Sequence, residues 1–117
     1  MNRTLLIALL LASVLLAAHL QALQEFAYWY YPWLDIPMHV LGGAAIGTFL
    51  LAFFSHSRTW LYFGCMFLVV LGWEVFEYFA RVSTGQPDYW IDTVLDIANG
   101  LAGAALALIV SRRSLWH

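Results

Sequence analysis

Three pairs of ionisable side chains stand at helical spacing within otherwise apolar stretches of this chain. At spacings of three or four residues, the two members of a pair share one face of a helix. The pairs are Asp35 and His39, Glu74 and Glu77, and Asp92 and Asp96. Several carboxylates close together in a low dielectric need a compensating cation, and carboxylates with imidazole are ligands for divalent metals. The spacing therefore predicts a divalent metal site.

Three residues are the strongest candidates for metal ligands. His39, Glu74 and Asp96 lie deepest in their apolar stretches or directly opposite one another, so solvation at a membrane surface explains them least well. Glu77 or Asp92 is the candidate catalytic general base, because burial raises the pKa of a carboxyl group toward the value that such a base needs. Alternatively, Asp92 lies shallow enough to be solvated.

Arg81 is the candidate substrate-binding residue, since a guanidinium can hold an anionic headgroup. Its alternative role is an i, i+4 ion pair with Glu77. We expect supporting roles for Asp35, Asn99 and His19. The structural alternatives are a helix cap for Asp35 (and for Asp88), an interhelical hydrogen bond for Asn99, and a satisfied bundle histidine for His19.

The composition is that of a membrane protein. Of the 117 residues, 63% are hydrophobic and only 10% are charged, against about 25% charged in soluble domains. The net charge of −2 excludes a strongly basic surface and gives no support for a nucleic-acid partner. Cys65 is the single cysteine, so neither a disulfide framework nor a cysteine metal motif is present in this sequence.

Four apolar runs predict an all-α fold, a four-helix transmembrane bundle that forms a single domain over residues 1–117. Each run is about as long as the 20 residues that a spanning helix needs. The predicted spans are residues 4–23, 36–54, 59–80 and 89–110. We expect the first to be an uncleaved helix, since it is long for a signal-peptide core. The aromatic residues of 28–33 are typical of an interfacial belt.

The arginines predict the topology. Arg3, Arg58, Arg112 and Arg113 flank one side of the four spans, whereas only Arg81 flanks the other. The positive-inside rule therefore places both termini in the cytoplasm. Counted along each helix, the acidic residues and His39 then lie roughly 5–12 Å below the outer edge, which predicts one site near the outer leaflet.

Glycines beside these polar residues predict close helix packing. Gly42, Gly43 and Gly47 lie in the second span, and Gly100 and Gly103 lie in the fourth. Small residues at such positions let two membrane helices approach at backbone distance. These glycines therefore permit close packing against a neighbouring helix.

The motifs together resemble those of the VanZ-like and YjdF-like families of small bacterial membrane proteins. They are Asp35-x-x-x-His39-x-x-x-Gly43, then Trp73-Glu74-x-x-Glu77, then Asp92-x-x-x-Asp96 followed by Asn99 and Gly100. The resemblance covers about residues 35–104, and the late aspartate-to-asparagine spacing is three residues here rather than four. It implies a bacterial inner-membrane protein, in a family with one member linked to glycopeptide-antibiotic resistance, and it supplies no reaction.

Three functions fit this pattern. The first is a metal-assisted hydrolase or transferase that acts on a membrane lipid or a lipid-linked headgroup. The second is an ion- or proton-handling protein, which would need a polar path that the inner half offers only at Thr48 and Cys65 unless a homo-oligomer supplies one. The third is a non-catalytic partner, such as a VanZ-like resistance accessory, in which the cluster only holds helices together.

The predicted topology is tested by cysteine labelling in intact cells. Ser57→Cys lies in the predicted cytoplasmic loop and Ser83→Cys in the predicted outer loop, with Cys65 replaced by Ala in both. We expect a membrane-impermeant maleimide to label only the second variant. Equal labelling of both from outside would exclude this topology.

Overall fold

The computed structural model describes residues 2–54, 58–80 and 88–113. Within these ranges every secondary-structure element is a helix, and four of the helices are long and apolar enough to cross a membrane. The long helices are α1 (Arg3–Gln24), α3 (Asp35–Leu51), α4 (Thr59–Phe79) and α5 (Tyr89–Arg112). A short helix α2 (Ala27–Tyr30) and a 3₁₀ turn η1 (Pro32–Leu34) connect α1 to α3. The predicted four-helix, all-α fold is confirmed.

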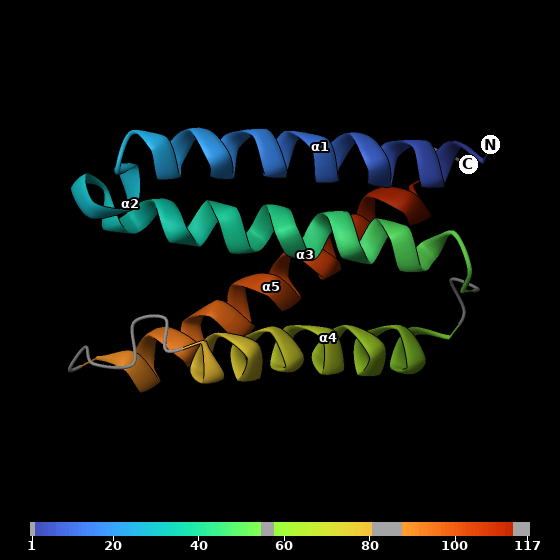
Figure 1. Ribbon diagram of the computed structural model, residues 1–117. Coiled ribbons are helices and arrows are strands. Elements are labelled where there is room, and N and C mark those ends of the chain that lie inside the picture. The colour runs from blue at the N-terminus through green and yellow to red at the C-terminus, as the bar shows by residue number, and fades with distance from the viewer. Residues whose placement is uncertain (1, 55–57, 81–87, 114–117) are drawn as a thin grey trace.

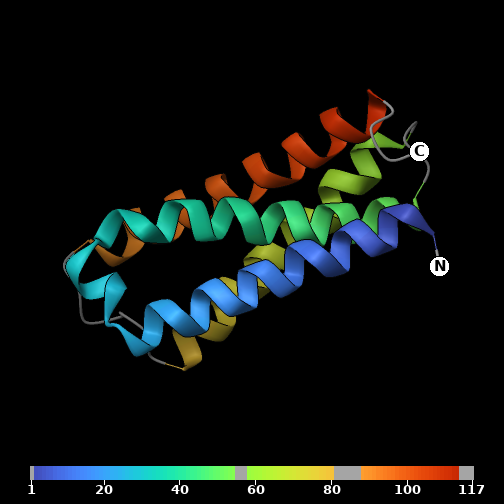
Figure 2. The same ribbon diagram turned by 90° about the horizontal axis from the view of Figure 1, so that it is seen from above.

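The helices form an elongated bundle with extents of 42 × 28 × 20 Å. The first turn of α1 and the last turn of α5 lie at one end of the bundle, and α2 lies at the other (Figure 1). Turning the view shows that α3 lies beside both α1 and α5 (Figure 2). We call the half that contains α2 the α2 end, and the opposite half the termini end.

The connection between α1 and α3 is itself partly helical. Phe26 has a left-handed backbone conformation, with φ of 54°, and reverses the chain at the end of α1. The aromatic residues that follow form α2 and η1 with their rings outward, and Trp29 is 83% exposed. Exposed tryptophan and tyrosine at one end of a membrane bundle fit the predicted aromatic belt.

The predicted capping role of Asp35 is wrong. Because η1 already turns the backbone helically, Leu34 occupies the N-cap and Asp35 is the first residue of α3, with φ of −59° and ψ of −36°. A capping side chain needs a non-helical backbone. Asp88 does occupy the N-cap of α5 as expected, although its side chain makes no capping hydrogen bond.

The tightest helix contact is between α3 and α5, the two helices that carry these glycines. At Gly43, an added Cβ would overlap the carbonyl group of Gly100. At Gly103, it would overlap the backbone of α3 at Val40 and Ala44. The two helices therefore touch backbone to backbone, and no side chain larger than hydrogen fits at either position.

Apolar packing fills the termini end. Tyr62, Met66 and Val70 of α4 pack against the small residues of α5, with Ala104 completely buried between them. The Tyr62 hydroxyl donates a 2.7 Å hydrogen bond to the Ala104 carbonyl group and so satisfies the one polar atom of this side chain. This contact joins α4 to the α3–α5 pair.

We predict opposite effects of alanine at two glycines. Gly103→Ala should lower the free energy of unfolding by about 1–3 kcal/mol, because its methyl group meets the α3 backbone. Gly64→Ala is the control: it points into open space on α4, and alanine favours a helix over glycine by about 1 kcal/mol. Thermal unfolding in detergent measures both, and equal shifts for the two variants would contradict the backbone contact.

Candidate functional site

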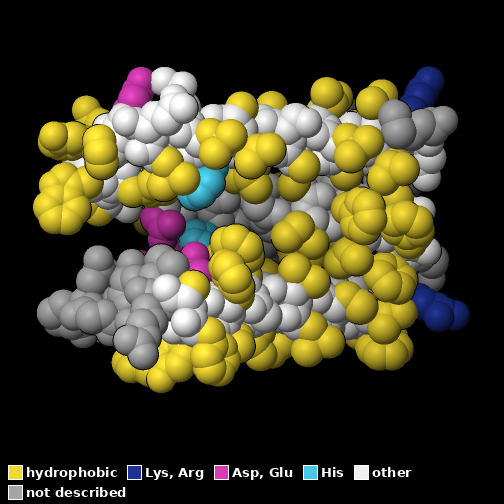
Figure 3. Space-filling model, in the orientation of Figure 1, with side chains coloured by type: hydrophobic (Ala, Val, Ile, Leu, Met, Phe, Trp, Pro, Cys, Tyr) yellow, Lys and Arg dark blue, Asp and Glu magenta, His cyan; other side chains and the backbone are white. Residues whose placement is uncertain are grey.

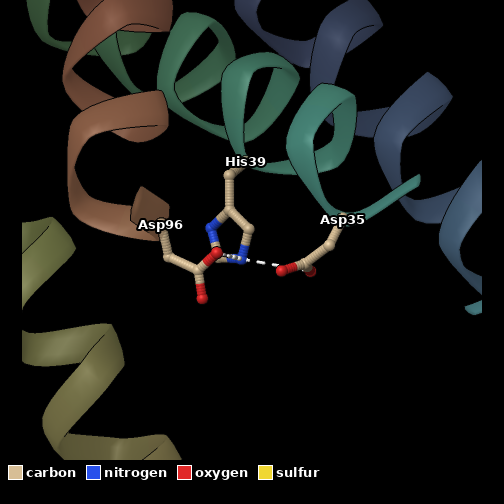
Figure 4. Close-up of side chains that lie close together, drawn as sticks. All are labelled: Asp35, His39 and Asp96. Carbon is tan, nitrogen blue, oxygen red and sulfur yellow. Dashed lines mark ion pairs between the residues drawn. The ribbon is translucent and has the colours of Figure 1, made fainter. Parts of the chain in front are cut away.

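The α3–α5 contact brings two acidic residues to one imidazole. His39 Nε2 lies 3.3 Å from Asp35 Oδ1 on its own helix and 3.4 Å from Asp96 Oδ1 on α5. Figure 4 shows the ring held between the two carboxyl groups. The Asp96 side chain is only 7% exposed. One ligand atom from each of these residues lies within 4.8 Å of the others, which is close enough for a common metal ion.

A second group of acidic side chains shares Asp96. Glu74 and Glu77 of α4 each bring a carboxylate oxygen within 4.8 Å of Asp96 and of each other. Glu77 is oriented by Trp73, whose indole N–H donates a 3.0 Å hydrogen bond to Glu77 Oε1. The helical i, i+3 spacing therefore directs both glutamates toward α5, as the sequence predicted.

Among the described residues, Glu74 is the buried polar side chain that lacks hydrogen-bond partners. It is 4% exposed, and neither of its carboxylate oxygens has a hydrogen-bond partner there. A buried carboxyl group without partners destabilises a fold by several kcal/mol unless a proton or cation compensates it. Such a group, aimed at other carboxylates, is what a cation site requires.

The cluster lies next to open space at the α2 end. The space-filling view shows a hollow between the α1 side and the α4 side, with acidic and histidine side chains at its walls (Figure 3). A separate groove of about 240 Å³ runs between α4 and α5, where Glu74 meets the aromatic rings of Tyr78, Tyr89 and Trp90. Polar groups thus adjoin an apolar surface that a lipid chain could cover.

His19 contacts a tyrosine and belongs to neither metal-ligand group among the described residues. Its Nδ1 lies 2.7 Å from the hydroxyl group of Tyr28, and the ring is exposed on α1. Burial, followed by the charge of nearby Asp35, raises the pKa of Tyr28 above its usual value. His19 is therefore a hydrogen-bonded histidine beside the site. No sequence pattern predicts Tyr28 as its partner.

The remaining predicted residues fall around the cluster or outside the described part. Asp92 is half-buried one turn before Asp96, and belongs to neither metal-ligand group among the described residues. Asn99 is half-buried, and within the described ranges its side chain makes no hydrogen bond to another helix. Arg81, and with it the predicted pair with Glu77, lies outside the described residues.

The predicted ligands His39, Glu74 and Asp96 do not form one ligand group among the described residues. Asp96 groups once with Asp35 and His39 and once with Glu74 and Glu77. Sequence reasoning gave Asp35 too small a role by treating it as a cap, although its i, i+4 spacing to His39 carried the signal. Glu77, expected as a general base, lies among the candidate ligands.

Chemically, the cluster offers oxygen and imidazole donors, a set suited to Mn²⁺, Zn²⁺ or Mg²⁺. Comparison of the chain with protein-family models, curated proteins and solved structures finds no match.

Proposed function

We propose that the protein is a divalent-metal-dependent membrane hydrolase or transferase that acts on a lipid or lipid-linked headgroup at the outer leaflet. The observation that carries this proposal is the Glu74 carboxyl group, which is buried, lacks partners among the described residues, and faces Glu77 and Asp96. A cation bound there would compensate these charges.

A purely structural role fits this arrangement less well. Polar residues that hold membrane helices together act through interhelical hydrogen bonds. Glu74 makes none with the described residues, and the helices already meet through the backbone contact at Gly43 and Gly103. The cluster is therefore not needed to explain how α3 and α5 associate.

Ion transport is also less well supported. A carrier needs polar groups along a path through the membrane. In the described part of the termini end, the hydroxyl groups of Thr48, Tyr62 and Ser111 each donate to a backbone carbonyl group. The polar side chains thus gather at the α2 end, which favours a site that serves one face of the membrane.

The surroundings of the cluster favour an amphipathic substrate. The groove between α4 and α5 has aromatic and aliphatic walls, and Glu74, whose carboxylate oxygens are buried, is one of its lining residues. A lipid placed there would cover apolar side chains with its acyl chain and bring its headgroup to the level of the cluster. Anionic phosphate oxygens would be repelled by bare carboxylates, so the proposed cation is also what allows such a headgroup to bind.

For hydrolysis of a phosphoester, a water oxygen forms a bond to phosphorus while the ester P–O bond breaks. The departing oxygen keeps the electron pair of that bond. A bound divalent cation supplies Lewis-acid stabilisation of the phosphoryl oxygens. Asp92, on the same helix face as Asp96 and outside both ligand groups, is the carboxylate that we assign to receive the proton of the water.

The proposed location follows from the sequence motifs and arginines. The resemblance to VanZ-like and YjdF-like proteins supports a bacterial inner membrane, and the positive-inside rule supports cytoplasmic termini. The site would then face the side on which cell-envelope lipids carry their exported headgroups. Arg81 would lie at that surface and attract an anionic headgroup.

Metal binding is tested with Glu74→Gln, which keeps the shape of the side chain and removes only its charge. After treatment with chelator, the parent protein should gain thermal stability when Mn²⁺ or Zn²⁺ is added, by about 2.7 kcal/mol at a free concentration 100 times Kd. Glu74→Gln should gain much less. Glu25→Gln is the matched control, since Glu25 is exposed on the connection after α1 and bonds only locally to Gln21.

The outcome of this experiment decides between a cation site and a structural cluster. A parent protein that binds neither metal and gains no stability would exclude the proposed site. So would a Glu74→Gln protein with the metal content of the parent.

Catalysis is tested by reconstitution into phosphatidylglycerol vesicles that contain a polyprenyl monophosphate as reporter, because hydrolysis of its ester P–O bond releases phosphate. We expect phosphate release that stops on addition of chelator and falls at least about 100-fold in Asp92→Asn, the loss expected for a general base. Metal binding should persist in this variant, because Asp92 is in neither ligand group. Equal release by the parent and by Asp92→Asn would contradict the assigned base.

A further inference from the structure

We propose that the cluster holds two divalent cations, and that Asp96 bridges them. This inference rests on the proposed function, which requires only one cation. The two donor groups, Asp35–His39–Asp96 and Glu74–Glu77–Asp96, have one residue in common. The first draws its other residues from α3 and the second from α4, and α5 supplies Asp96 to both.

The spacing of the first group fits a cation better than a hydrogen-bonded imidazole. His39 Nε2 lies 3.3 Å and 3.4 Å from the two aspartate oxygens. Charge-assisted N–H···O bonds are shorter, about 2.7–2.9 Å. In a tetrahedral site with metal–ligand bonds of about 2.0–2.1 Å, neighbouring ligand atoms lie about 3.4 Å apart. The His39 nitrogen is thus already at ligand-to-ligand distance from both carboxyl groups, and these two carboxyl groups lie within 4.8 Å of each other.

The second group needs its own compensating charge. Glu74 is buried, and neither of its carboxylate oxygens has a hydrogen-bond partner among the described residues. Within the same residues, the Trp73 indole is the one hydrogen-bond donor to Glu77. His39 does not belong to this group, so its donors are three carboxylates. A cation held only by the first group would leave the Glu74 carboxyl group without a ligand bond.

The charges of the whole cluster balance with two cations. The two groups contain four different carboxylates and one imidazole. With all four carboxyl groups ionised and His39 neutral, one divalent cation would leave an excess of two negative charges, whereas two divalent cations would balance the four carboxylates. Glu74 and Asp96 are buried, and Asp35 and Glu77 are half-buried. Buried like charges without compensation are strongly unfavourable.

Asp96 has the geometry of a bridging ligand. In Figure 4 one of its oxygens faces the His39 ring, while the other points away from both His39 and Asp35. A carboxylate can bind one cation through each of its oxygens. Pairs of cations held in this way stabilise both the attacking and the leaving oxygen in displacement at phosphorus, so the inference narrows the substrate class to phosphoesters.

The test is the number of Mn²⁺ ions bound per chain, measured by elemental analysis after equilibrium dialysis of the full-length protein in detergent. We expect two for the parent, one for Asp35→Asn, and one for Glu77→Gln. The matched controls Asp88→Asn and Glu25→Gln remove exposed carboxylates from outside both groups and should keep two. If Asp35→Asn does not fold, His39→Gln removes the same group.

Electron paramagnetic resonance tests the bridge. Two Mn²⁺ ions joined by Asp96 should give an exchange-coupled spectrum in the parent, and the single-ion six-line spectrum in Asp35→Asn and Glu77→Gln. Asp96→Asn should abolish the coupled spectrum even at saturating Mn²⁺.

The outcomes separate this inference from the proposed function. One Mn²⁺ ion in the parent, whether retained in Asp35→Asn or lost in both single variants, would overturn the two-cation centre and leave a single-metal enzyme standing. A parent that binds no Mn²⁺ and no Zn²⁺ would overturn both proposals.

Discussion

The site depends on the direct backbone contact between α3 and α5. Gly43 and Gly103 let these helices approach so closely that residues one turn away can reach across the interface with short side chains. Aspartate has a single methylene group, so Asp96 contacts His39 only because the backbones are already in contact. A larger residue at either glycine would separate the helices and move the two sides of the polar cluster apart.

The two ends of the bundle are packed by different physical means. At the termini end, α4 is fixed by apolar side chains and by the Tyr62–Ala104 hydrogen bond. At the α2 end, α4 brings Glu74 and Glu77 against α5, and the space beside them is partly open. Apolar packing therefore holds the helices together at the termini end, and the polar side chains gather at the α2 end.

The sequence predicts the fold well and the site in part. Four long apolar runs allow little besides membrane helices, and glycines in two of them indicate close helix packing. The depth of the polar residues along their helices predicted that His39, Glu74 and Asp96 converge, whereas the structure places His39 and Glu74 in two groups that share Asp96. The spacing paired Asp35 with His39, but it could not predict that Asp35 is a helix residue and not a cap, because the η1 turn that puts it there depends on how the aromatic segment folds. The contact of His19 with Tyr28 likewise depends on the left-handed residue Phe26, which no local pattern indicates.

The α3–α5 contact also has a consequence for biogenesis. The ribosome makes α3 long before α5, so α3 enters the bilayer with Asp35 and His39 while Asp96 has not yet been synthesised. Neither α1 nor α4 contributes a ligand that completes the Asp35–His39 pair. The Asp35–His39 pair therefore lacks its α5 partner until α5 has been made, and the cluster is completed when α5 packs against α3.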